Sequence, residues 1–154
     1  MPRHTHASHT IRIAAPVEQC QRFFTPAGEE LWVDGWKPTY LHPQDGCTLS
    51  GLVFTTGSGE DYTIWNLVDY DTKAYYARYA RVTPALRTGT VEVQCTAVDD
   101  SHTDVAVTYT LTALTSKGSE SLASFEGPAF VAMIEEWKQA IDTQLVSLLL
   151  SHIR

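Results

Sequence analysis

The sequence predicts an α+β domain in which a curved antiparallel sheet wraps around one long C-terminal helix. Two observations predict this class. From Leu52 to Ala113, apolar residues recur at every second position in segments separated by short turns, as in an antiparallel sheet. From Pro128 to Leu150 they recur at helical spacing, so an amphipathic helix follows the strands.

The segment before the repeated strands predicts one strand and two short helices. Residues 10–14 alternate apolar and polar side chains, as in a short strand. Pro16 is suited to the start of a first helix, and Thr25 with Pro26 to the N-cap and first position of a second. Residues 1–10 are expected to form a solvated tail, which leaves a single domain over residues 11–154.

The middle of the chain predicts an antiparallel meander. Residues 36–51 are rich in Pro, Gly, Asp and His, which indicates a loop with one short strand around residues 39–41. Short connections favour antiparallel pairing of the five β segments that follow: 52–56, 62–70, 74–83, 90–98 and 104–113.

The last segment predicts one uninterrupted helix from Pro128 to Leu150, about 34 Å long. One stripe of this helix is apolar and is expected to face the sheet: Phe130, Ile134, Trp137, Ile141, Leu145 and Leu148. A helix of this length crosses the whole sheet of a small domain and leaves room for a ligand between the two.

The composition of the chain limits the classes of partner, cofactor and cellular location that we expect. The chain of 154 residues has 18 acidic and 11 basic residues and a formal charge of −7, which argues against nucleic acid. No run of apolar residues is long enough for a membrane span. The three cysteines form no CxxC pair, so reduced thiols in a cytoplasmic protein are expected, with no metal and no cofactor.

The element order resembles that of the START-like helix-grip superfamily, also called SRPBCC, which includes polyketide cyclases/dehydrases and lipid-transfer proteins. Four phrases are similar to bacterial members: Ala15–Glu18, Trp32–Trp36, Val107–Thr112 and Phe130–Trp137. The resemblance implies the helix-grip fold and a cavity. We expect this cavity to bind a small hydrophobic or aromatic molecule, in a protein that is a monomer or a homodimer. Two alternatives stay open: a polyketide cyclase/dehydrase-like enzyme, and a protein-interaction module resembling chaperone-activating members.

Apolar residues expected on the inner face supply most of the candidate lining. They are Trp36, Phe54, Trp65, Tyr76, Tyr109, Ile134 and Trp137. Core filling is the more common role of an aromatic residue on the inner face of a sheet. Tyr109 is the best polar candidate, because a buried hydroxyl needs a partner.

The facing of Arg78 depends on strand register. If Val82 opposes Val91, Arg78 points inward, together with Asn66 on the preceding strand, and its guanidinium would bind a carboxylate, phosphate or phenolate. The alternative is an outward Arg78 balanced by surface acids. A slip of one residue brings in a different set: Tyr75, Tyr79 and Arg81.

Acid/base catalysis would require a titratable group at the cavity. Three residues in loops near the expected mouth are the candidates: Asp34, His42 and Glu126. A surface charge or loop residue is the more common interpretation of each.

Overall fold

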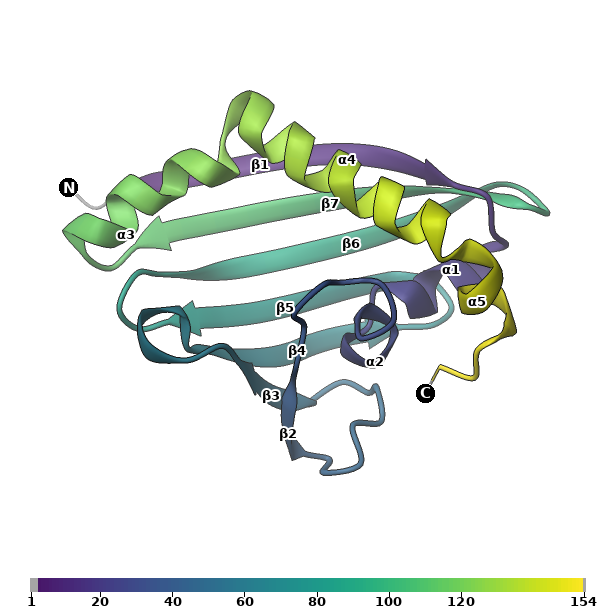
Figure 1. The fold of residues 1–154 in the computed structure, drawn as a ribbon, viewed down its shortest axis with the longest axis horizontal. Helices are drawn as coiled ribbons and strands as arrows, with labels where there is room; N and C mark the ends of the chain where they lie inside the picture. The colour runs from purple at the N-terminus through teal and green to yellow at the C-terminus, as the bar shows by residue number, and fades with distance from the viewer. Residues whose placement is uncertain (1–2, 154) are drawn as a thin grey trace.

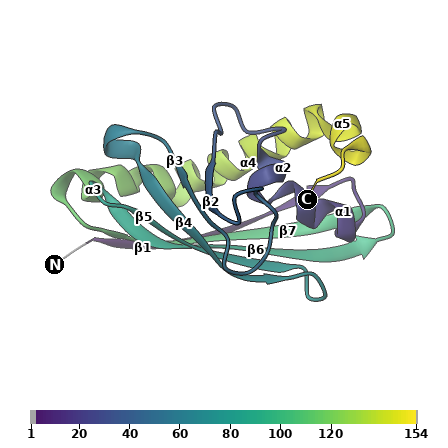
Figure 2. The same ribbon diagram turned by 90° about the horizontal axis from the view of Figure 1, so that it is seen from below.

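The computed structural model describes residues 3–153 as a seven-stranded antiparallel sheet with helices packed on one face (Figures 1 and 2). The strands lie in the order β1-β7-β6-β5-β4-β3-β2. Their bounds are β1 (His4–Ile13), β2 (Thr39–His42), β3 (Val53–Thr56), β4 (Thr63–Asp71), β5 (Tyr76–Thr83), β6 (Arg87–Asp99) and β7 (His102–Ala113). The helices are α1 (Val17–Phe23), α2 (Pro26–Glu29), α3 (Ser116–Ser121), α4 (Gly127–Thr143) and α5 (Leu145–Leu150), with short 3-10 turns η1 (Gly59–Asp61) and η2 (Leu122–Phe125).

Alternation along the long central strands produces the buried face of the sheet. Val91 lies opposite Tyr109 and Val93 lies opposite Val107, and all four side chains are buried. The residues between them point to the other face and are half-buried. A period of two therefore places one apolar row after another under the helices.

The sheet bends around the helices (Figure 2). Register shifts interrupt its ladders between Leu67 and Asp69 and between Ala97 and Asp99. Such bulges bend a strand and increase its twist. The α+β class, the curved antiparallel sheet and the long helix after the strands are confirmed.

Helix α4 packs its apolar stripe on the sheet and crosses it obliquely (Figure 1). Phe130, Ile134 and Ile141 are at most 1% exposed. The single helix predicted over residues 128–150 is interrupted at Gln144, whose N–H is shared between the carbonyls of Ala140 and Ile141. This tightened last turn involves no Gly or Pro, so the sequence carries no stop signal there. No helix within residues 3–153 is both long and apolar enough to cross a bilayer.

The first strand is longer than predicted. It starts at His4, so residues 4–10 pair with β7 where a tail is expected. The ring of His6 bonds the hydroxyl of Thr110 at 2.9 Å. Alternation among polar residues is invisible to a search for apolar periodicity. The predicted tail includes residues 1–2 and the predicted domain includes residue 154. These residues lie outside the described part of the chain.

Candidate functional site

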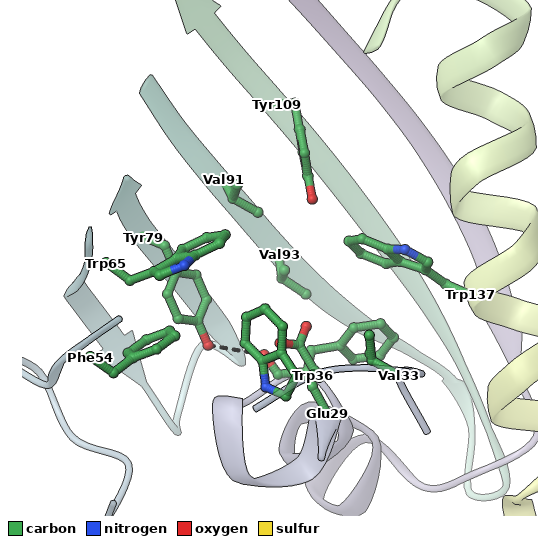
Figure 3. A pocket seen from close by; sticks show the side chains of 11 residues that line it. Glu29, Val33, Trp36, Phe54, Trp65, Tyr79, Val91, Val93, Tyr109 and Trp137 are labelled. Atoms are coloured by element: carbon green, nitrogen blue, oxygen red, sulfur yellow. Dashed lines mark hydrogen bonds between the residues drawn. The ribbon is translucent and has the colours of Figure 1, made fainter. Parts of the chain in front are cut away.

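A cavity of about 80 Å³ lies between the inner face of the sheet, the segment around α2 and helix α4 (Figure 3). The sheet supplies Phe54 of β3, Trp65 of β4, Tyr79 of β5, Val91 and Val93 of β6, and Tyr109 of β7. Helix α4 supplies Trp137, and the segment that follows α1 supplies Phe24, Glu29, Val33 and Trp36.

Strand register gathers the sheet residues into one patch. Phe54 lies directly opposite Trp65. Val91 lies between Tyr79 on one neighbouring strand and Tyr109 on the other. Directly opposed residues point to the same face, so residues from different strands form a continuous floor.

Aromatic rings contact one another around the cavity. The rings of Phe54 and Trp65 are stacked, with centroids 5.6 Å apart and planes 3° apart. Trp36 meets both edge-on, at 6.0 and 5.8 Å. On the α4 side, the Trp137 ring lies within 6.5 Å of three further rings: Phe24, Trp32 and Tyr109. Stacked and edge-on pairs hold ring positions more tightly than aliphatic contacts do.

Two indole hydrogen bonds fix the segment that carries the α2 wall. The Nε1–H of Trp32 donates to the carbonyl of Phe23 at 2.7 Å. That of Trp36 donates to the carbonyl of Pro26 at 3.0 Å. Both bonds fold the loop back on the helices and hold Glu29, the last residue of α2, against the cavity.

Glu29 is the one acid among the lining residues, and its carboxyl points into the cavity (Figure 3). Within residues 3–153 this carboxyl has no hydrogen-bond or ion-pair partner. Burial among apolar groups disfavours the charged form and raises the pKa of Glu29 well above its ordinary value of 4.5. A protonated or readily protonated carboxyl therefore faces a ring of aromatic side chains.

Two tyrosines face the cavity with different roles. The hydroxyl of Tyr79 donates to the carbonyl of Phe24 at 2.9 Å. The hydroxyl of Tyr109 points into the cavity (Figure 3) and has no hydrogen-bond partner within the described residues. Burial raises the pKa of Tyr109 to about 12, so it is a neutral donor at neutral pH.

Solved structures share this architecture. No family model matches the sequence, and no curated protein matches it. Norcoclaurine synthase from Thalictrum flavum superposes with a TM-score of 0.66 and 12% identity, covering 98% of this chain and 96% of that one. Zhui aromatase/cyclase from a Streptomyces species superposes with a TM-score of 0.56 and 16% identity, covering 94% of this chain and 88% of that one. Major latex-like protein 151 from Panax ginseng gives 0.64 and 10%, covering 92% and 97%.

The chain has the helix-grip fold. At these identities the likeness concerns the fold, and the chemistry has to be argued from the residues of this chain. The helix-grip cavity brings together five residues predicted from the sequence: Trp36, Phe54, Trp65, Tyr109 and Trp137. Ile134 is fully buried in the core and does not line the cavity. Contact of the five with a ligand stays a prediction.

The register predicted for the β5–β6 hairpin is wrong. Val82 lies opposite Thr88 instead of Val91, a shift of three residues. The connection is shorter than predicted, since pairing continues up to Thr83 and Arg87. An odd shift exchanges the inner and outer faces of the strand.

The predicted interior polar residues consequently lie on the outer face of the helix-grip sheet. Asn66 and Arg78 are exposed. Tyr76 is half-buried there and donates a hydrogen bond to Glu92 at 2.6 Å. Arg81 faces inward in place of Arg78, which is the facing that the alternative register implies.

The acid/base candidates predicted near the mouth do not line the helix-grip cavity. Asp34 and His42 are exposed, and Glu126 forms an ion pair with Arg3. Glu29 occupies the position expected for such a group, and the sequence prediction missed it. The local sequence carries no signal for this placement, because the facing of Glu29 depends on how the four-residue helix α2 packs.

Proposed function

We propose that the protein binds a small aromatic or otherwise hydrophobic molecule in the cavity between the curved sheet and α4. The composition of the lining carries this proposal. Seven of the eleven lining residues are aromatic, three are valines and one is an acid. A mostly apolar wall with very few polar groups is the usual form of a small-molecule site.

A fold neighbour supports single-ring ligands. Norcoclaurine synthase from Thalictrum flavum has been solved in complex with dopamine and hydroxybenzaldehyde, and that structure matches this chain with a TM-score of 0.65. Both compounds are small aromatic molecules with polar substituents. We infer a ligand of comparable size for this cavity.

The cavity must widen to admit an aromatic ring. Its volume of about 80 Å³ is smaller than the ~150 Å³ cavity that holds benzene in an engineered protein core. The strand residues that form the floor are at most 8% exposed, whereas Val33 and Trp36 on the α2 side are half-buried. Outward movement of these two side chains is the least costly way to enlarge the site.

Two protic groups orient the ligand. The hydroxyl of Tyr109 and the carboxyl of Glu29 both reach the cavity without a partner among the described residues. A ligand that hydrogen-bonds to either group gains affinity without displacing a partner in the protein. We therefore expect a ring that carries a carbonyl or hydroxyl substituent.

Tryptophan fluorescence tests binding directly, because all four tryptophans lie at the cavity or contact its lining. Titration with hydroxybenzaldehyde, catechol and indole should quench or shift the emission saturably. Val93→Phe, which fills the cavity, should weaken binding at least about tenfold. Val68→Phe adds the same ring at an exposed position of β4 and should leave affinity unchanged. Equal affinities in these two variants would refute binding in the cavity.

A cytoplasmic location belongs to the same proposal. The cysteines are free thiols, with Cys20 and Cys95 buried and Cys47 half-buried. Reduced thiols are typical of the cytosol, where disulfides seldom persist.

A second candidate function is proton transfer, and Glu29 is the observation that favours it. A carboxyl with a raised pKa in a mostly apolar cavity is the usual form of a general acid or base. A cyclase/dehydrase-like enzyme requires a group of this kind beside the reacting carbon atoms of its substrate. Glu29 would take a proton from carbon next to a carbonyl and return it to oxygen.

A generic probe of buried bases tests this second candidate. In 5-nitrobenzisoxazole a base removes the ring C–H proton while the N–O bond breaks, giving a coloured cyanophenolate. The rate should rise with pH through the raised pKa of Glu29 and be lost in Glu29→Gln. Glu136→Gln, at an exposed acid on α4, should keep the rate. A rate unaffected by Glu29→Gln would exclude Glu29 as the base.

A further inference from the structure

Two arginines of the β5–β6 hairpin face the interior of this acidic chain. Arg81 lies between Trp65 on β4 and Gly89 on β6, directly opposite both. Arg87 follows on β6, opposite Thr83, and shares the inner face. The net charge of the chain is −7, so its overall charge does not attract anions. Two cationic side chains on the inner face are therefore unexpected.

The side chain of Arg81 has an aromatic contact but no polar partner within the described residues. Its guanidinium carbon lies 4.5 Å from the centre of the Trp65 ring. Its Nε is buried without a hydrogen bond, and the side chain forms no ion pair with any residue from 3 to 153. Arg12 on the outer face shows the contrast, because it bonds both oxygens of Asp104, at 2.8 and 3.1 Å.

Arg87 repeats this arrangement with one bond added. Its guanidinium carbon lies 4.8 Å from the centre of the Phe125 ring. One terminal nitrogen donates to the Ser121 hydroxyl at 2.9 Å, while its Nε is buried and unpaired. Burial lowers the pKa of both arginines, and the charge of Asp61, which acts on Arg87, does not offset it.

The two cations lie next to the cavity. Trp65, which Arg81 covers, lines it, and so does Tyr109, on whose hydroxyl both positive charges act. A guanidinium removed from water without a counter-charge is costly. Cation–π contact with Trp65 offsets part of this cost and leaves the N–H donors unmatched.

We propose that Arg81, with Arg87 beside it, forms an oxyanion subsite at the β5–β6 end of the cavity, so that the natural ligand is an aromatic acid. This inference rests on the proposed function and names the ligand class for the same cavity. The ring lies among the aromatic side chains, and its acidic group accepts hydrogen bonds from the Arg81 fork. A planar carboxylate matches that fork with two parallel bonds.

Binding of matched probes tests the subsite. Benzoate and benzamide have nearly the same shape and differ in charge, and phenyl phosphate offers a second oxyanion. Affinities would be measured by calorimetry or ligand-observed NMR at neutral pH for the wild type, Arg81→Gln and Arg78→Gln. Arg78 is the matched control, because it lies three positions away on the same strand with its side chain exposed on the outer face.

We expect the wild type to bind benzoate at least about tenfold more tightly than benzamide. This preference should vanish in Arg81→Gln and persist in Arg78→Gln, and Arg81→Lys, which keeps the charge but loses the fork, should retain part of it. A stronger preference for phenyl phosphate supports the subsite and assigns it to phosphate esters.

The outcomes separate the two proposals. Equal affinity of the wild type for benzoate and benzamide would overturn the oxyanion subsite and leave the aromatic cavity standing. A preference that survives in Arg81→Gln would also overturn it. If no aromatic probe binds, charged or neutral, the proposed function fails and the subsite with it. Thermal unfolding of each variant verifies its fold. If Arg81→Gln does not fold, the benzoate preference of Arg81→Lys is compared with that of the wild type, and an undiminished preference would overturn the subsite.

Discussion

The hydroxyl of Tyr79 donates a hydrogen bond to the backbone carbonyl of Phe24 and so ties the floor of the cavity to the end of α1. Tyr109, on the far side of Val91, has no such bond among the described residues. The same side chain is structural on one strand and available for a ligand two strands away.

Replacing each tyrosine with phenylalanine should separate these roles. Tyr79→Phe leaves a buried carbonyl unpaired and should lower the free energy of unfolding by about 1–3 kcal/mol. Tyr109→Phe breaks no bond in the described chain, so stability should change little while affinity for carbonyl or hydroxyl ligands falls. Urea unfolding and ligand titration measure the two effects. Equal losses of stability would contradict the assignment.

The raised pKa of Glu29 makes stability depend on pH. The folded state holds this proton more tightly than the unfolded state, so the stabilisation is complete below about pH 4.5 and is lost as pH rises through the folded pKa. Glu29→Gln removes this dependence, and its stability relative to the wild type should increase over that range. Unfolding curves at successive pH values measure the difference, with Glu136→Gln as the exposed control. A constant difference would show that Glu29 titrates normally.

Ile134 should behave as a core residue. It is 0% exposed and does not line the cavity, so Ile134→Ala should cost about 2–5 kcal/mol of stability. Val131→Ala, at a 39% exposed position on the same helix, should cost much less. Ligand affinity of the folded Ile134→Ala protein should match the wild type. A selective loss of affinity would restore Ile134 to the binding site.

Gly89 is required where β6 passes β7. A Cβ placed there would lie 1.9 Å from the carbonyl oxygen of Thr110, and no rotation of a side chain relieves contact with backbone. Gly89→Ala should therefore destabilise the protein by about 1–3 kcal/mol or more. The neighbouring substitution Thr90→Ala, at a half-buried position on the opposite face, is the control. Differential scanning calorimetry compares the two melting temperatures.

The element order could be predicted because strong periodicities mark it. Apolar alternation placed the central strands, and the stripe from Phe130 to Ile141 placed the main helix. The start of β1 could not be predicted, because its first residues include no large apolar side chains. The alternating positions there are occupied by Thr5 and Ala7 between polar side chains. The interruption at Gln144 carries no Gly or Pro and could not be predicted.

Facing was harder to predict than position. Trp65 and Tyr109 alternate within strands whose inner face is unambiguous, so they were placed on the cavity side. The facing of Tyr79 and Arg81 depends on the length of one hairpin loop. An error of three residues in the register placed Arg78 on the inner face in their place. Glu29 required knowledge of how a four-residue helix packs, which local sequence does not encode.

Four of the residues around the cavity, Phe24, Glu29, Val33 and Trp36, belong to one short stretch that contributes no strand to the sheet. Substitutions in this stretch can therefore change the acid and the other lining residues that it supplies without changing any strand pairing. A graft of the same stretch from a related scaffold is the natural unit for redesigning what the molecule recognises.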